Sequence, residues 1–409
     1  MTTTDDGVDL GAGGAEAPID HLASDRFAGL DGLRGLAALA VVATHVGFAT
    51  GQYGRGTWGA LLSRLAVGVA VFFVLSGFLL SRPWLLHAVR GSARPRAGAY
   101  LWRRALRILP AYWVAVLAGL TLVRTNRDAT TVDWVRHLLL VQVYWPNWDR
   151  DGLSQMWSLC AEAAFYVVLP VIMAALLRRL RPWRLRPVLL LALAMTVVGL
   201  VTTSLTNGLH PVLPGQAGVW LLRHAGWFAG GIALAALSVQ VNDLPPRLRP
   251  VLRAAAQPGC CWAAAGAVLW ISTTPLAGPV TLDPSSPAAA VTSEVLYGTV
   301  ALLLLLPLAL PSRPGLLLAA LDSPPLQRLG DLSYGIFLYH LVLLLGVRAL
   351  LDQPLFTGSF WQTMLLTTAA AWLCAAVSRR FLERPAMRLR RLVLAASPLP
   401  QPERAGSKP

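Results

Sequence analysis

Long apolar runs alternate with short polar segments along most of the chain. A helix that spans a membrane needs about 20 mostly apolar residues, and this rule predicts about ten spans whose ends are uncertain by several residues. The fold class is therefore all-α, a polytopic membrane bundle over residues 27–391, with polar tails at 1–26 and 392–409 that we expect to be disordered and cytosolic. The predicted spans are Leu33–Thr50, Leu65–Leu80, Ile108–Val123, Gln155–Leu177, Pro187–Leu205, Val219–Val239, Arg253–Thr273, Ser293–Leu310, Ser333–Leu351 and Phe360–Val377.

The composition agrees with a membrane protein. Of the 409 residues, 55% are hydrophobic and 13% are charged, whereas soluble domains have about 25% charged residues. The net charge of +15 can indicate nucleic-acid binding. Here, however, the arginines gather between apolar runs, which is typical of cytosolic loops of membrane proteins. We therefore expect a lipid bilayer as partner and no nucleic acid.

The distribution of arginines predicts the topology. The loop after the third span is an exception, because its Arg127, Arg136 and Arg150 are mixed with four aspartates; it also contains Val132–Tyr144, a candidate interfacial helix. An even number of spans places both termini in the cytosol of a multi-pass plasma-membrane protein. The arginine-rich segments are residues 82–107, 178–186, 247–253, 313–328 and the tail from 379, where we expect Glu383-Arg384-Pro385 to end the last helix at the cytosolic surface.

Two ionisable residues interrupt the first apolar run. Arg34 lies near its start and His45 near its far end. In a helix they share one face, roughly 16 Å apart along the axis. Ionisable groups inside a membrane are costly and usually face a bundle interior or a water-filled cavity, so both are candidate functional residues. The alternative is an arginine that reaches the cytosolic surface and a histidine that is hydrogen-bonded between helices.

Three later spans add polar residues inside apolar helices. Ser76 stands beside a glycine in the second span, a pair that helix packing also explains. Glu162 near the start of the fourth span needs a partner, and His45 is expected at a similar depth. Tyr334 and His340 lie in the ninth span, where an interhelical hydrogen bond is an equally good explanation for the histidine.

A basic stretch precedes the third span. It contains Arg103, Arg104 and Arg107, which we place on the cytosolic side. Guanidinium groups bind phosphate bidentately, so they can hold a phosphorylated donor. The alternative is ordinary topology-determining charge in contact with anionic lipid.

The four cysteines give no sign of a metal site. All lie in apolar surroundings, and none has metal-ligand spacing or an obvious partner. We therefore expect neither a metal nor a bound cofactor.

Taken together, these segments resemble the membrane-bound acyltransferase 3 family, which includes bacterial O-antigen and glycan O-acetyltransferases and macrolide 3-O-acyltransferases. Six pieces occur in the same order between Asp31 and Pro385. One departure is Ala163-Ala164, where many members have a second acidic or polar residue after the glutamate. The pieces are LDGLRGLAALAVVATH, VFFVLSGFLL, RRALRILPAYW, MWSLCAEAAFY, LGDLSYGIFLYH and FLERP.

The resemblance implies transfer of an acyl group from acyl-CoA, with acetyl-CoA as the expected co-substrate, to a hydroxyl of a sugar, glycolipid or macrolide-type secondary metabolite. It also implies functional roles for the arginine and histidine of the first helix, Arg34 and His45, for the serine of the second, Ser76, and for Glu162. The acyl chain, the acceptor, the side of the membrane on which the acceptor binds and the oligomeric state stay open.

The residues allow direct transfer. His45 would act as general base on the acceptor hydroxyl, Glu162 would orient it and stabilise the imidazolium, and Arg34 would hold the phosphate or thioester end of the donor. Ser76 is an alternative acyl carrier, but a serine nucleophile needs a base within hydrogen-bond reach, so direct transfer is favoured. The remaining candidates, assigned to substrate binding together with Ser76, are Arg104, Arg107, Tyr334 and His340.

The competing function is a proton-coupled exporter. Many spans with intramembrane arginine, glutamate and histidine fit that class as well. A weak inverted repeat with paired broken helices would indicate it, and the sequence shows no such repeat. Acceptor-dependent release of CoA thiol would separate the two functions.

Overall fold

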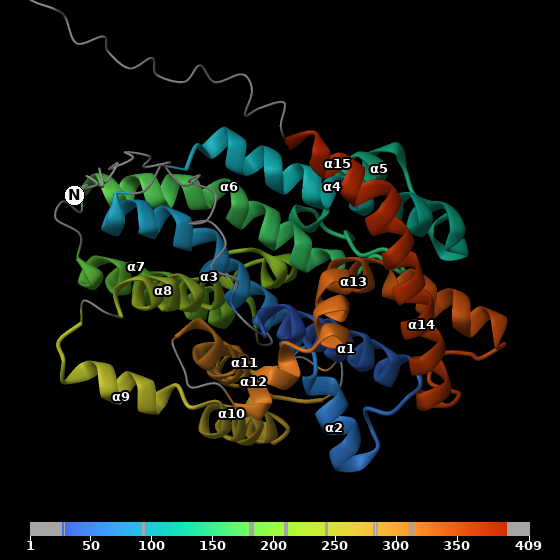
Figure 1. Cartoon of the computed structure of the whole chain (residues 1–409). Coiled ribbons are helices and arrows are strands. Elements are labelled where there is room, and N and C mark those ends of the chain that lie inside the picture. The colour runs from blue at the N-terminus through green and yellow to red at the C-terminus, as the bar shows by residue number, and fades with distance from the viewer. Residues whose placement is uncertain are drawn as a thin grey trace, which may run out of the picture.

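The computed structural model describes residues 27, 29–91, 95–179, 184–207, 212–241, 244–280, 283, 285–310 and 315–390. The predicted tails, 1–26 and 392–409, lie outside these residues. Helices are the only regular elements in the described part of the chain, and they form one bundle (Figure 1).

The predicted all-α, multi-span membrane bundle is confirmed. Within the described ranges, eight helical segments are long and apolar enough to cross a membrane, and two shorter apolar helices, α8 and α10, fall at the other two predicted spans. The main helices are α1 Leu30–Ala49, α3 Val67–Arg90 preceded by α2 Gly56–Arg64, α4 Ala97–Leu122, α6 Met156–Arg179, α7 Leu185–Thr206, α8 Ala225–Gln240, α10 Pro258–Ser272, α11 Pro287–Ala309, α13 Pro324–Leu350 and α14 Phe360–Ser378. The remaining short α-helices are α5 Thr131–Leu138, α9 Leu248–Ala255, α12 Leu316–Leu321 and α15 Arg384–Arg388.

Helix α4 begins earlier than predicted. We expected the third span to start at Ile108, after a basic cytosolic stretch, but the helix starts at Ala97. Arg103, Arg104 and Arg107 therefore lie on α4 itself. A rule based on hydropathy leaves arginine-rich residues out of a predicted span. They can still belong to the helix, because alanine, leucine and arginine are all good helix formers.

The last helix does not end at the predicted place. We expected Pro385 to terminate it, because an internal proline lacks a backbone donor and clashes with the preceding turn. Instead α14 passes through a wide π-helical turn, Arg379–Glu383, and Pro385 stands in the first turn of α15. Proline is tolerated in a first turn, where its missing N–H has no helical partner. The arginines of α15 are thereby held against the end of the bundle.

Helix α1 is held closely between α3 and α13. A Cβ at Gly330 of α13 would lie 1.9 Å from the carbonyl oxygen of Asp31, and one at Gly68 of α3 would lie 2.4 Å from that of Ala37. Small residues allow helices in membranes to approach this closely. The packing fixes where the side chains of α1, including Arg34, enter the bundle.

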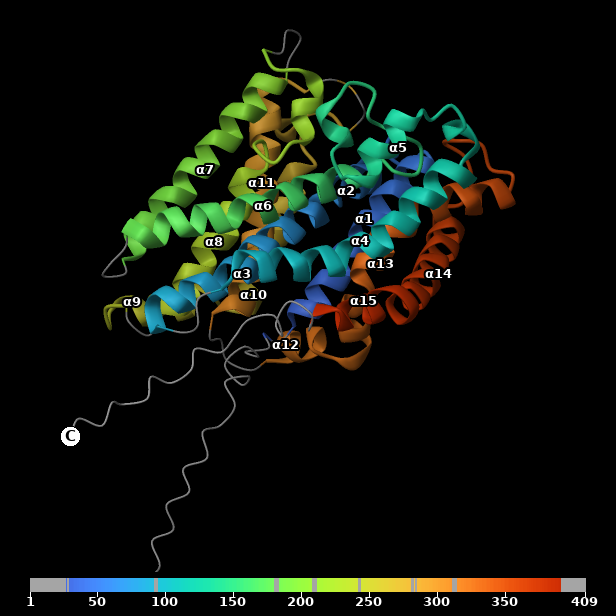
Figure 2. The same ribbon diagram turned by 90° about the horizontal axis from the view of Figure 1, so that it is seen from above.

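The loop that breaks the arginine alternation is folded around ion pairs. Arg150 lies 2.8 Å from Asp128 and 2.7 Å from Asp133, so its charge is neutralised locally. The loop includes α5, which lies at one end of the bundle, whereas α12 and α15 lie at the other (Figure 2). Local pairing explains how this loop carries Arg150 outside the pattern.

The helix predicted at Val132–Tyr144 is present in two parts. Helix α5 begins with a capping box between Thr130 and Asp133. Leu140 then adopts a positive φ of 60°, and a 3-10 turn, Gln142–Tyr144, follows. The left-handed residue ends the helix and separates the two parts.

Candidate active site

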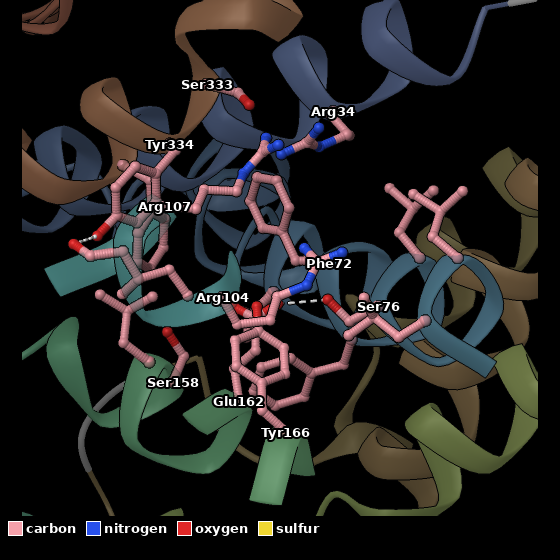
Figure 3. Close-up of a pocket in the computed structure, with 18 residues that line it drawn as sticks. Arg34, Phe72, Ser76, Arg104, Arg107, Ser158, Glu162, Tyr166, Ser333 and Tyr334 are labelled. Atoms are coloured by element: carbon pink, nitrogen blue, oxygen red, sulfur yellow. Dashed lines mark hydrogen bonds between the residues drawn. The ribbon is translucent and has the colours of Figure 1, made fainter. Parts of the chain in front are cut away.

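Five helices, α1, α3, α4, α6 and α13, enclose a cavity of about 170 Å³, here called the central cavity. The α3 wall is apolar apart from Ser76, and the walls are polar where α1, α4 and α6 meet. Six of the eight sequence-predicted site residues line it: Arg34, Ser76, Arg104, Arg107, Glu162 and Tyr334. Figure 3 shows these side chains pointing into the same space from four different helices and α13.

Glu162 has a different partner from the expected one. Its carboxylate accepts a hydrogen bond from the Ser76 hydroxyl, drawn as a dashed line in Figure 3. The predicted approach to His45 does not occur, because α6 packs against α3 and α4 whereas α1 packs against α13 and α3. Tyr166 lies one turn after Glu162. The guanidinium carbon of Arg104 is 5.7 Å from the centroid of the Tyr166 ring.

The two candidate histidines meet each other. Nε2 of His340 lies 3.3 Å from Nδ1 of His45, and His340 is fully buried whereas His45 is partly exposed. His45 Nδ1 is also 2.8 Å from the Val41 carbonyl oxygen, and His340 Nδ1 is 2.6 Å from that of Phe337. A carbonyl only accepts, so these contacts assign the hydrogen to Nδ1 of both rings. Nε2 of His45 is then the nitrogen with a free lone pair.

An aromatic pair separates the central cavity from the histidines. The rings of Phe72 and Phe337 meet edge to face, with centroids 5.8 Å apart, and both line the cavity. The ring of Phe337 is also 5.8 Å from that of His340. The histidine pair therefore lies just beyond the apolar wall of the cavity.

A second cavity of about 400 Å³, here called the end cavity, lies where α1 begins and α15 ends. Arg34, Arg107 and Tyr334 line both cavities and form the neck between them. Tyr334 is fixed there because its hydroxyl donates to the Ile108 carbonyl oxygen, 2.8 Å away. The side chains that line only the end cavity are Asp31, Asp331, Arg379, Glu383, Arg384, Met387, Arg388 and Arg390.

Our sequence analysis did not select the arginines of α15. Arg384 and Arg388 are four residues apart, a spacing that puts them on one helical face. This spacing is visible in the sequence, but we did not consider a helical face there because we expected Pro385 to end the helix. The neck residues, in contrast, were all among the predicted candidates.

A separate buried cluster lies behind Phe73, which lines the central cavity and whose ring centroid is 5.8 Å from that of His224. His224 Nδ1 is 2.9 Å from Glu294 Oε1, and Arg223 Nε is 3.6 Å from Glu294 Oε2. The His224 ring packs against Trp157 and Trp227, with centroids 4.9 and 4.6 Å away. An acid inside the apolar run of α11 was the sequence signal for this cluster, and we did not select it.

No group of three or more His, Cys, Asp or Glu side chains is placed to hold a metal ion in the part of the chain that the structure describes. The polar groups that line the central cavity are guanidinium, carboxylate and hydroxyl groups. Arginines can bind phosphate or stabilise a developing oxyanion, and the histidine pair can accept a proton.

Comparison with known proteins assigns the family. A family model described as an acyltransferase domain matches residues 27–379. Nodulation protein 10 of Rhizobium leguminosarum bv. viciae is 28% identical over 371 residues, which cover 83% of this chain and 87% of the relative. Peptidoglycan O-acetyltransferase OatA of Listeria monocytogenes is 27% identical over 388 residues, covering 87% of this chain.

The match to the Listeria protein covers 55% of that relative, so the chain spans about half its length. O-acetyltransferase OatA of Staphylococcus aureus is 26% identical over 179 residues, covering 40% of this chain and 28% of the relative. No solved structure matches the chain significantly. Because the family model covers residues 27–379 of 409, the chain belongs to the membrane-bound acyltransferase 3 family and is an acyltransferase.

Proposed function

We propose that this enzyme transfers an acyl group from an acyl-CoA, with acetyl-CoA as the first donor to test, to a hydroxyl of a sugar, glycolipid or macrolide-type metabolite. The observation that carries the proposal is the arginine-lined end cavity that shares its neck with the central cavity, whose apolar wall of Phe72 and Phe337 stands before the histidine pair. The names of two relatives, both O-acetyltransferases, support an oxygen acceptor.

The donor enters from the cytosol in this proposal. Arg107 and Arg34 at the neck attract its phosphate-bearing end, and Arg104 lies deeper, beside Ser76 and Glu162. A positively charged passage favours an anionic carrier and disfavours neutral hydrocarbon. The acyl arm extends into the apolar part of the central cavity toward Phe72 and Phe337.

His45 is the proposed general base. Its Nε2 takes the proton from the acceptor hydroxyl as the oxygen attacks the thioester carbonyl; the C–S bond breaks, and the thiolate leaves as CoA thiol after accepting that proton. His340 is the positioning residue, because its Nε2 accepts from Nδ1–H of His45 and stabilises the imidazolium. The aromatic pair Phe72–Phe337 must turn aside for the thioester to reach His45.

A second route uses Ser76 as acyl carrier. Its hydroxyl donates to Glu162, so the base that a serine nucleophile needs lies within reach. The guanidinium of Arg104 lines the same cavity and is available to stabilise the oxyanion. This observation favours the serine route more than the sequence did, and the two routes differ in whether an acyl-enzyme forms.

The test is the release of free CoA thiol from acyl-CoA by membranes that contain the enzyme. We expect release only when a hydroxyl acceptor is supplied, for which peptidoglycan fragments and a macrolide are the first two probes. A proton-coupled exporter would release no thiol under any condition. Equal release with and without every acceptor would identify a hydrolase and contradict the proposal.

A further inference from the structure

The end cavity carries a concentrated positive charge. Six arginines line it, against three carboxylates. It lies beside the central cavity and shares its neck, so a molecule bound in one extends readily into the other. A cavity of about 400 Å³ with this charge suits an anionic group of substantial size.

Not all of this charge is neutralised internally. Arg379 pairs with Asp331, 2.9 Å away, and Arg34 lies 3.9 Å from Asp31. Arg384 and Arg388, by contrast, form no salt bridge with any carboxylate among the described residues, and both are exposed residues that line the cavity. Guanidinium groups left without a carboxylate are suited to bidentate contact with phosphate.

The order of residues along the path defines the shape of the ligand. Arg384 and Arg388 line only the end cavity, Arg107 lines both, and Arg104 lines only the central cavity. A ligand with phosphates at one end and a long uncharged arm at the other would place its phosphates in the end cavity and its arm in the central cavity. The arm would point toward Phe72, on the apolar wall nearest the histidines.

We infer that the end cavity binds the phosphates of the nucleotide end of coenzyme A, with Arg384 and Arg388 of α15 as the phosphate ligands. This inference rests on the proposed acyl-CoA donor. It assigns a binding role to the segment after the π-helical turn, which would otherwise be only a basic membrane edge. An anionic lipid headgroup shares the phosphate chemistry, so the experiment must distinguish the two sources.

The experiment measures binding of CoA and of pantetheine, which lacks the nucleotide, to the full-length enzyme in nanodiscs of neutral phosphatidylcholine. The test variant is Arg384→Gln combined with Arg388→Gln. The matched control is Arg380→Gln, which removes a charge from the same segment at a residue that does not line the cavity. We expect the double variant to weaken CoA binding roughly tenfold or more, with pantetheine binding unchanged and the control like wild type.

Equal CoA affinity in the double variant and the control would overturn the inference. If the double variant instead loses only the thermal stabilisation that phosphatidylglycerol gives the wild type, the cavity holds a lipid headgroup and the inference is wrong. Failure of the proposed function has a different signature, since the wild type would then neither bind CoA nor release thiol in the presence of acceptor. If the wild type binds CoA and releases thiol, but the double variant binds CoA as tightly as the control does, the proposed function stands and the phosphate site on α15 is wrong.

Discussion

Nε2 of His340 lies 3.3 Å from Nδ1 of His45, across the contact between α13 and α1. Both rings are anchored to backbone carbonyls through Nδ1, at 2.8 Å for His45 and 2.6 Å for His340. The Val41 carbonyl and the His340 ring thus contact Nδ1 of His45. In a serine hydrolase triad, a carboxylate contacts the corresponding nitrogen and orients the histidine. These contacts at Nδ1 hold the His45 ring in one orientation and leave its Nε2 free, which is what a general base requires.

We predict that His45→Ala lowers kcat about 10²–10⁴-fold, because a general base is lost. His340→Ala should lower kcat less, on the order of tenfold to a hundredfold, since only a hydrogen bond to a charged ring is lost. The double variant should be no worse than His45→Ala, because residues that act as a unit are not additive. Steady-state kinetics at matched membrane abundance would check this. Additive losses, or an unchanged rate for His45→Ala, would contradict the assignment.

Arg104→Gln and Arg107→Gln should each raise the KM for acyl-CoA on the order of tenfold, as expected for the loss of a charge-assisted contact. The KM for the acceptor should change less. Arg103→Gln is the matched control, because this neighbour on α4 lines neither cavity. An unchanged donor KM in both variants would mean that these arginines only set the topology of the helix.

Both termini should be cytosolic. The arginine-rich segments, including the end of α14 and α15, alternate with loops of low basic charge, and the exceptional loop neutralises Arg150 by pairing with aspartates. Tags placed before Met1 and after Pro409 should resist protease added to sealed, right-side-out cells and become sensitive on lysis. Cleavage of one tag alone from outside would refute an even number of spans, and cleavage of both would refute the cytosolic orientation.

The positions of the helices were predictable because hydropathy is a local property. Each predicted span falls on a helix, and the errors occur where arginines belong to the helix, as at the start of α4, or where a span is short, as in α8. The candidates Arg34, Ser76 and Glu162 were found because a polar residue inside an apolar run is conspicuous.

The partners of these residues were not predictable, because they depend on which helices pack together. Equal depth suggested a contact between Glu162 and His45, yet α6 lies against α3 and the carboxylate meets Ser76. The end cavity depends on a π-helical turn that keeps α15 against the bundle, and a local proline rule gives the opposite expectation.

The loop between α4 and α6 should lose structure in two steps on acidification. Burial lowers the pKa of His137 below its ordinary value. Its contribution to the stability of the folded loop is therefore complete above about pH 6.5. It declines as the pH falls below that value, because the unfolded loop takes up the proton more readily than the folded loop. Burial acts to raise the pKa of Asp133. Hydrogen bonds from Thr130 and the charge of Arg150 outweigh this effect and hold that pKa below the usual carboxyl value. That stabilisation is present above about pH 4 and is lost as the pH falls through the lowered pKa.

Hydrogen exchange of backbone amides in residues 124–155, corrected for intrinsic rates, would follow both steps. Asp133→Asn should remove the lower step alone. His137→Gln should remove the upper step alone. Protection that does not change between about pH 6.5 and about pH 4 would contradict the role of His137, and protection that does not change as the pH falls below about 4 would contradict the role of Asp133.

The hydrogen bond between Ser76 and Glu162 leads to a test of the covalent route that needs no acceptor. If Ser76 carries the acyl group, its oxygen attacks the thioester carbonyl, Glu162 takes the hydroxyl proton, and the C–S bond breaks as the thiolate accepts that proton to leave as CoA thiol. The step is reversible, so the enzyme would exchange labelled CoA into acyl-CoA in the absence of acceptor.

With His45 as base in a direct transfer, we expect no such exchange, and Ser76→Ala should keep most of the activity. Ser81→Ala is the matched control on the same helix, since its buried hydroxyl bonds the Gly77 carbonyl oxygen outside the cavity. Exchange by the wild type that disappears in Ser76→Ala and persists in Ser81→Ala would establish an acyl-serine intermediate. In that case Glu162→Gln should also abolish exchange, because the amide cannot accept the serine proton.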